Sequence, residues 1–302
     1  MKSRSQTRTR IPFLAAAAVM GGLLACSLPQ LQPTSEVIFE PTIVLTQVPA
    51  VPPTAPPTQP VSLPASTAAV SAGQVVLHQP FAVIVAYIGP QTGTGSALFS
   101  PLQQAGQKAI EDHGLVHGFG VNLIAFNDFC TEAGGGAAAQ QIAADEHIVA
   151  VLGPVCSNGA IGALPVLQTA NVVMLSGSAT IPALSVYGPS VFHRTLLDDD
   201  QVDTLGYPSQ IYIEDLPAVQ TWLADFEAWG GGLLETGLNH YSPYQYDAMG
   251  VLLRALDLSS QALNDGSLLI DREALRAAVR STTNYPGVTG TITFEADGDR
   301  AP

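Results

Sequence analysis

Between residues 80 and 201, short apolar runs alternate with stretches patterned as helices. The first run, Phe81–Ile88, is continuously apolar and rich in β-branched residues, which is typical of a strand buried on both faces. Further runs predict strands at 121–126, 148–152, 172–175 and 191–195, with helices at 98–113, 136–145 and 161–169. Strands separated by helices of this length predict βαβ units and a parallel sheet.

The N-terminus has a different pattern. Four basic residues up to Arg10 precede an apolar stretch, 11–25, which is too short to span a bilayer comfortably and is typical of a signal peptide. It ends Leu23-Leu24-Ala25-Cys26, which resembles the lipobox of bacterial lipoproteins, whose cysteine is diacylated. Two acyl chains give stable anchoring, so we expect a protein lipid-anchored to the bacterial cell membrane, on its outer face or in the periplasm. The alternative is an ordinary secretory signal in which Cys26 is incidental.

Residues 26–79 are expected to be a disordered linker behind the lipidated cysteine. Ten prolines fall between Pro29 and Pro64, interleaved with Thr, Ser, Val and Ala. This composition favours polyproline II and cannot bury a core, so it predicts a spacer. A Pro-rich recognition peptide is the alternative. The predicted domains are therefore the signal peptide (1–25), the linker (26–79) and a folded domain (80–302).

Charge and hydropathy exclude several classes of protein. The net charge is −14, and without the first 25 residues 7 basic residues oppose 25 acidic ones, a net charge of −18. A nucleic-acid binder needs a basic face, so nucleic acid is not an expected partner. Beyond the N-terminus no apolar run reaches 18 residues, which excludes a polytopic membrane protein.

Motifs follow each of the predicted strands between Phe81 and Gln201. They are Tyr87-Ile88-Gly89-Pro90-Gln91-Thr92-Gly93, Phe126-Asn127-Asp128-Phe129-Cys130, Val151-Leu152-Gly153-Pro154-Val155-Cys156-Ser157, Leu175-Ser176-Gly177-Ser178-Ala179-Thr180-Ile181-Pro182, and Phe192-His193-Arg194-Thr195 with Asp198-Asp199-Asp200-Gln201. Any one of these motifs is weak evidence of a family, but five in the same order are specific. Together they resemble the first lobe of the leucine/isoleucine/valine-binding proteins, the type I periplasmic solute-binding family of ABC importers.

The resemblance continues in residues 211–302. Residues 216–230 resemble a late helix of the family, Tyr244 begins the long helix that returns to the first lobe, and 271–298 match the family's ending. In the long helix Met249, Leu252, Leu253 and Leu256 recur at i, i+3, i+4 and i+7, a stripe that needs a sheet to cover it. Most of the family's second lobe is missing after Gln201. We therefore expect an α/β fold with a single parallel-sheet αβα lobe, built from 80–201 and 211–302.

The resemblance also implies a ligand site. In the family this lobe holds the α-carboxylate and ammonium of an amino acid. Ser157, at a helix N-terminus, and the Thr180 hydroxyl match the carboxylate site, and the Ser178 carbonyl matches an acceptor for the ammonium. The loop from Gly89 to Ser96 matches one wall of an apolar side-chain pocket. The expected ligand-binding residues are Thr92, Gly93, Ser157, Ser178, Ala179 and Thr180. From the residues alone, without the resemblance, the preferred interpretation of Ser157 and Thr180 is that they are simple N-caps.

The family pairs cysteines at the positions of Cys130 and Cys156, which implies a disulfide. An even pair in an oxidising compartment agrees with this, and closing a loop of that size contributes about 3.5 kcal/mol in the chain-entropy model. The alternative is a nucleophilic thiol at Cys156, for which no His or Asn is placed as an activator.

The implied function is an extracytoplasmic, lipid-anchored substrate-binding protein for branched-chain amino acids, working with ABC permease subunits. Without the second lobe we expect a partial site of reduced affinity. The alternative is a one-lobe relic or protein-interaction module that no longer binds solute.

An enzyme is not expected. Ser157, Asp128 and His147 are available, but Gly-x-Ser-x-Gly, HExxH and P-loop patterns are all absent from the sequence. No cofactor or metal is expected, and Asp198–Asp200 is interpreted as a solvated turn, with calcium binding as the alternative.

Overall fold

The computed structural model describes residues 73–93, 95–187, 191–205, 216–230 and 239–302, all within the compact unit Pro64–Pro302. The predicted signal peptide, Cys26 and residues 26–72 of the predicted linker lie outside the described residues. In the part of the chain that is described, no helix has both the length and the apolar character needed to cross a bilayer.

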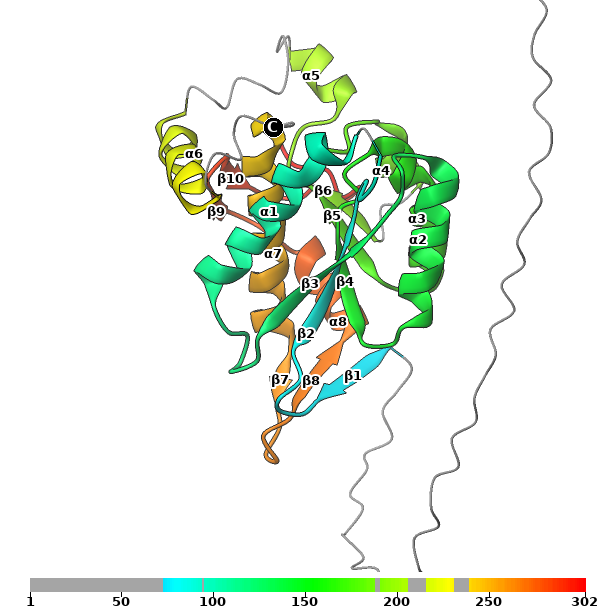
Figure 1. Cartoon of the computed structure of the whole chain (residues 1–302), viewed down its shortest axis with the longest axis vertical. Helices are drawn as coiled ribbons and strands as arrows, with labels where there is room; N and C mark the ends of the chain where they lie inside the picture. Colours follow the sequence, from blue (N-terminus) through cyan, green and yellow to red (C-terminus); the bar gives the residue numbers. More distant parts are fainter. Residues whose placement is uncertain (1–72, 94, 188–190, 206–215, 231–238) are drawn as a thin grey trace, which may run out of the picture. The chain divides into compact units, whose positions relative to one another are not determined.

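A five-stranded parallel sheet forms the centre of this unit (Figure 1). Its strands in spatial order are β3 (Val121–Phe126), β2 (Val83–Ile88), β4 (Ile148–Leu152), β5 (Val173–Ser176) and β6 (Phe192–Arg194). From β2 the chain passes to β3 on one side and then crosses to β4 on the other. The strand order therefore reverses between β2 and β4, which is where ligands of open α/β sheets bind, at the carboxyl ends of the strands.

Helices cover both faces of this sheet. Side chains alternate along β2, so Val85 and Tyr87 join one core and Ala86 and Ile88 the other. The first core lies under α1 (Ser96–His113), α7 (Ser242–Ser259) and α8 (Arg272–Arg280), and the second under α2 (Glu132–Ala144) and α3 (Ser157–Thr169). The predicted stripe of α7 is fully buried in the first core. The α/β fold class with a parallel sheet is thus confirmed.

Helices α2 and α3 begin four residues earlier than the sequence predicts. Both starts are rich in glycine, which has low helix propensity and hides the helix from pattern analysis. The glycines allow the two helices to approach closely, because a Cβ at Gly135 would lie 2.0 Å from the Gly159 carbonyl oxygen. A Cβ at Gly162 would lie 1.8 Å from the Glu132 carbonyl oxygen. Tertiary packing therefore sets these helix starts.

A small antiparallel sheet corrects the predicted start of the folded domain. It pairs β1 (Gln74–Leu77) with β8 (Leu268–Asp271), and β8 with β7 (Gln261–Ala262). Residues 74–77 were expected in the linker, which extended to residue 79. They form a strand because Val75 and Leu77 alternate into the core beneath α7 and α8.

The remaining elements are short segments and one longer helix. They are α4 (Ala183–Tyr187), α5 (Asp199–Leu205), α6 (Pro217–Gly230), the 3-10 helix η3 (Asn239–Tyr241), β9 (Tyr285–Gly287) and β10 (Gly290–Ile292). The acidic run expected to be a solvated turn starts α5 instead. Asp198 is buried, its Oδ1 accepts from the Gln201 amide at 2.6 Å, and the Gln201 side chain accepts from the Asp198 amide at 3.0 Å. This reciprocal pair is a capping box.

Candidate functional site

The loops that follow β2, β4 and β5 meet at the carboxyl edge of the sheet. Backbone hydrogen bonds join them there: the Val155 amide donates to the Ile88 carbonyl at 3.1 Å, and the Gly153 amide to the Leu175 carbonyl at 2.8 Å. Neighbouring strands lie about 4.8 Å apart, so the loops that follow three adjacent strands span a distance comparable to the size of an amino acid. The edge at the strand-order reversal is therefore where the candidate site lies.

Ser157 is the first residue of α3, and Cys156 occupies the N-cap position. The Cys156 side chain makes no capping hydrogen bond, so it accepts none from the amides of the first turn of α3. By contrast, the Thr131 hydroxyl caps α2 by accepting from the Gly134 amide at 3.0 Å. The interpretation of Ser157 as a simple N-cap is therefore wrong, and its half-buried hydroxyl accepts from the Ile181 amide at 3.4 Å.

The loop after β5 brings the next three predicted residues beside Ser157. The Ser178 hydroxyl donates to the Val155 carbonyl at 2.8 Å, which ties this loop to the one after β4. Thr180 is half-buried, and because α4 begins at Ala183, Thr180 is not an N-cap. Ala179 is fully buried, with its amide donating to the Ser176 hydroxyl and its carbonyl accepting from Arg194. The backbone polar groups of Ala179 are thus engaged inside the protein and are not available to a ligand.

Thr92 and Gly93 lie in the exposed loop between β2 and α1. Asn127, which follows β3, fixes this loop: its Nδ2 donates to the Thr92 hydroxyl at 2.8 Å, and its Oδ1 accepts from the Gln91 amide at 3.0 Å. A hollow of about 230 Å³ opens beside it, lined by Pro90, Gln91, Ser96, Ala97, Phe99, Ser100 and Gln103. Four of these seven side chains are polar, whereas the resemblance implies an apolar pocket wall.

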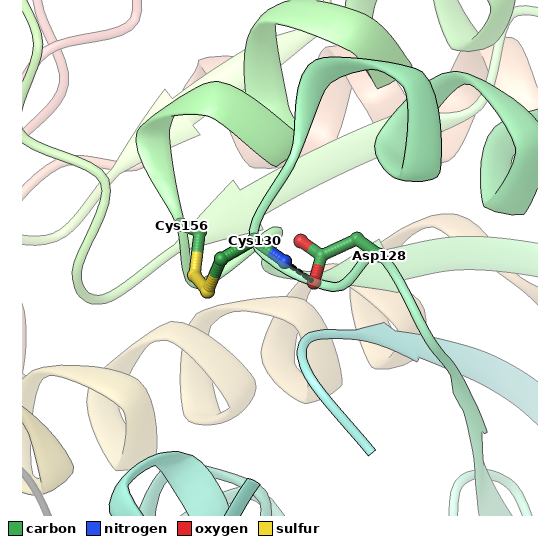
Figure 2. A group of neighbouring side chains, drawn as sticks. All are labelled: Asp128, Cys130 and Cys156. Atoms are coloured by element: carbon green, nitrogen blue, oxygen red, sulfur yellow. Dashed lines mark hydrogen bonds between the residues drawn. A yellow bond between two sulfur atoms is a disulfide. The ribbon is translucent and has the colours of Figure 1, made fainter. Parts of the chain in front are cut away.

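Cys130 and Cys156 form a disulfide with their Cα atoms 5.2 Å apart (Figure 2). It joins the loop after β3 to the start of α3, beside Ser157. In the described residues these sulfurs and Asp128 are grouped closely enough to hold a metal ion, but the disulfide uses both sulfurs. A thiolate nucleophile or metal ligand at Cys156 is incompatible with this bond.

Asp128 is fully buried beside the disulfide, and its Oδ1 accepts from the Cys130 amide at 2.9 Å (Figure 2). Its Oδ2 lies against the first turn of α3, where a Cβ on Gly159 would come within 2.1 Å of it. Burial raises the pKa of this carboxyl, because the charged form loses hydration. Burial and the nearby Asp128 charge also raise the pKa of the Tyr87 hydroxyl. Tyr87 is therefore un-ionised at any physiological pH.

Ser157, Asp128 and His147 do not form a catalytic triad. His147 immediately precedes β4, whereas Ser157 lies beyond its carboxyl end, so the five residues of β4 separate them. At about 3.3 Å per residue this places the imidazole beyond hydrogen-bond reach of the hydroxyl. His147 instead contacts Asp145, its Nδ1 lying 3.2 Å from Oδ1.

Three residues at this edge were missed as site residues by the sequence analysis: Ser176, Asn127 and Arg194. The Ser176 hydroxyl accepts from the Ser178 and Ala179 amides at 3.2 and 3.0 Å and so shapes the loop after β5. The available signal was polarity inside apolar strands, because a fully buried arginine such as Arg194 requires partners.

Known proteins resemble this chain in sequence and in fold. The profile of the periplasmic binding protein family matches residues 82–209. An amino acid binding protein of Pseudomonas aeruginosa is 26% identical over 122 residues, which are 39% of this chain and 33% of the relative. The chain thus spans about a third of the length of this curated relative.

Solved structures share the fold. A leucine binding protein, LivK, of Thermotoga maritima aligns with a TM-score of 0.58 and 17% identity, covering 72% of this chain and 93% of that one. LivJ of Streptococcus pneumoniae, a branched-chain amino acid transporter substrate-binding protein in complex with isoleucine, aligns with a TM-score of 0.56 and 10% identity, covering 73% and 94%. The described unit thus has the type I periplasmic binding protein fold. Residues 82–209 thus resemble the periplasmic binding protein family in sequence, and the described unit resembles it in fold.

Proposed function

We propose that this protein is the amino-acid-binding component of an ABC importer, anchored outside the cytoplasm through Cys26. The observation that carries the proposal is the pairing of Ser157 with the loop after β5 at the carboxyl edge of the sheet. A hydroxyl, a half-buried threonine and the start of α3 lie together there. This combination favours a carboxylate, because helix amides and the helix dipole stabilise negative charge.

The ligand is proposed to be a free amino acid whose carboxylate lies at Ser157 and Thr180. The Ser178 carbonyl is the acceptor proposed for the ammonium group. Branched-chain side chains are the first choice, because structural neighbours bind leucine and isoleucine. The polar lining of the hollow beside Gln91 makes glutamine and serine necessary members of any ligand panel.

A thermal-unfolding titration tests this proposal. Leucine, isoleucine, valine, glutamine and serine are each added at millimolar concentration, and leucinamide serves as the ligand without a carboxylate. A ligand at one hundred times its Kd stabilises the protein by about 2.7 kcal/mol. We expect at least one amino acid to raise the midpoint and leucinamide not to. No response to any amino acid would overturn the proposed ligand class.

A pair of variants locates the site. Thr180→Val removes the hydroxyl at nearly constant volume, and we expect it to abolish most of the ligand-induced rise. Thr169→Val is the matched control, because its hydroxyl donates to the Pro165 carbonyl at the opposite end of α3. Equal ligand responses in both variants would remove Thr180 from the site.

The lipid anchor is tested separately in the full chain. Cys26→Ser removes the only thiol at the end of the proposed signal peptide, so we expect the protein to move from the membrane fraction to the soluble extracytoplasmic fraction. Retention in the membrane fraction of a variant from which the signal peptide has been removed would contradict lipid anchoring through Cys26.

A further inference from the structure

The fully buried guanidinium of Arg194, on β6, lies directly behind the loop that carries Ser178 and Thr180. Its Nη1 donates to two carbonyls of that loop, those of Ala179 and Ile181, each at 3.1 Å. The carbonyl between them, that of Thr180, accepts from the Asp199 amide at 3.1 Å. Three consecutive carbonyls of the loop are therefore held, two by Arg194 and one by the Asp199 amide.

The C-terminal segment completes this arrangement. Asp299 accepts from the Arg194 Nε at 2.5 Å through Oδ1, and the same oxygen accepts from the Ser185 hydroxyl at 2.6 Å. Arg194 also contacts the Ser185 hydroxyl through Nη2. The Arg194 amide donates to the Gly298 carbonyl at 3.1 Å, so the backbone holds the two segments together as well. The guanidinium thus has a carboxylate as its charge partner, and its N–H donors to the loop carbonyls are held in place.

The geometry of the peptide bond determines which way the N–H groups of this loop point when its carbonyls are held. In a planar trans peptide the C=O and the N–H point in opposite directions. When the Ala179 carbonyl is held against Arg194, the N–H of Thr180 in the same peptide must point away from the guanidinium. In the next peptide, the Ile181 amide reaches the Ser157 hydroxyl at the start of α3, which places that hydroxyl opposite the Asp199 amide that holds the Thr180 carbonyl.

We infer that Arg194, held by Asp299 and Ser185, is a positioning residue that turns the Thr180 amide and hydroxyl toward the start of α3. This inference deepens the proposed function, on which the ligand arm of its test rests. Arginine is required here because one planar group must reach a carboxylate, a hydroxyl and two carbonyls together. The ammonium of a lysine cannot serve all four positions.

Hydrogen exchange of the free protein tests the inference without any ligand. In Arg194→Lys, which keeps the charge beside Asp299, we expect the amides of Ala179, Ile181 and Asp199 to exchange at least tenfold faster. The amides of α7 report global stability. Val279→Ala, in the core beneath α8, is the control for general destabilisation. We expect it to keep the wild-type ratio between the exchange rates of the loop amides and of the α7 amides.

The outcomes separate the inference from the proposed function. Two results for Arg194→Lys would overturn the positioning role. In the first, its loop amides exchange at the wild-type rate. In the second, the ratio of loop exchange to α7 exchange is the same as in Val279→Ala. Should Arg194→Lys fail to fold, Ser185→Ala removes one shared hydroxyl; we expect about threefold faster loop exchange, and no change would overturn the role.

The ligand arm uses leucine with the wild-type protein and both variants. We expect at least a tenfold weaker Kd in Arg194→Lys and an unchanged Kd in Val279→Ala. Equal Kd values in all three proteins would overturn the positioning role. A wild-type protein that does not respond to leucine counts against the proposed ligand, and the exchange experiment then decides the positioning role by itself.

Discussion

Buried polar side chains decide the shape of the loops at the scale of single residues. The Ser176 hydroxyl shapes the loop after β5, and Asn127 joins the loops after β2 and β3. The fully buried Ser176 satisfies backbone amides that would otherwise be unpaired inside the protein, and the half-buried Asn127 fixes an exposed loop. An apolar pattern analysis treats these residues as interruptions, although they fix the conformation of the candidate site.

Asp247 on α7 gives a direct test of this principle. Its carboxylate accepts from the Val288 amide at 2.8 Å, from the Thr289 amide at 2.9 Å and from the Thr289 hydroxyl at 2.6 Å. Asp247→Ala leaves these buried donors unpaired, so we expect a loss of about 3 kcal/mol in the free energy of unfolding. Denaturant titration measures it, with exposed Asp225→Ala as the control. A loss below that of the control would contradict this role.

His193 makes the stability of the protein depend on pH. Burial lowers the pKa of its ring from 6.5 to about 4 in the folded protein. Between these pH values the unfolded chain binds more protons than the folded one, so the contribution of His193 to stability is complete above pH 6.5 and is lost as the pH falls toward 4. The loss amounts to about 3 kcal/mol.

Denaturant titrations at pH 7 and pH 4.5 measure this effect. His193→Leu is expected to flatten the change of stability with pH, whereas the exposed His147→Gln is expected to keep the wild-type slope. A wild-type slope in His193→Leu would assign the acid sensitivity to other groups.

At the scale of secondary-structure elements, glycines set the distance between α2 and α3. Gly162→Ala would bring a Cβ within 1.8 Å of the Glu132 carbonyl oxygen, so the helices must separate. We expect a loss of 2 kcal/mol or more, on the order of other overpacked cores. Gly136→Ala is the matched control, because its Cβ would lie 3.4 Å from the Gly162 carbonyl oxygen. It is expected to be neutral or slightly stabilising, since alanine favours the helix.

The disulfide joins the same two helices through their N-terminal loops. The cysteines are separated by 26 positions, for which the chain-entropy model gives about 3.5 kcal/mol. We expect the double variant Cys130→Ser/Cys156→Ser to unfold at correspondingly lower urea concentration. Reductant is expected to shift the wild-type protein to the same midpoint and to leave the variant unchanged. A wild-type midpoint that is insensitive to reductant would contradict this contribution.

At the scale of the whole molecule, segments far apart in the sequence complete one another. β1 pairs with β8, α7 covers the sheet made by residues 83–194, and Asp299 neutralises Arg194. The described residues thus form a unit that cannot be divided at residue 211 without exposing apolar surface. Deletion of an end segment is therefore expected to affect the entire fold.

A chain that begins at Pro80 tests this expectation. It lacks Val75 and Leu77, which are 5% and 4% exposed in β1. Losing two buried apolar side chains costs about 3 to 5 kcal/mol by area. We therefore expect a lower thermal midpoint than in a chain that begins at Gly73. Equal midpoints would contradict a stabilising contribution of β1.

The sequence by itself determined the parallel sheet and the resemblance to the periplasmic binding proteins. A continuously apolar strand must be covered by helices on both faces of its sheet. The motifs that follow such strands lie at strand ends, and this does not depend on contacts between distant parts of the chain. It did not determine the starts of α2 and α3, the strand β1, or the network behind the loop after β5. Glycine contacts, the β1–β8 register and the Arg194–Asp299 pair join residues between 24 and about 200 positions apart. Such contacts leave no periodic signal, because they depend on which surfaces meet once the chain has folded.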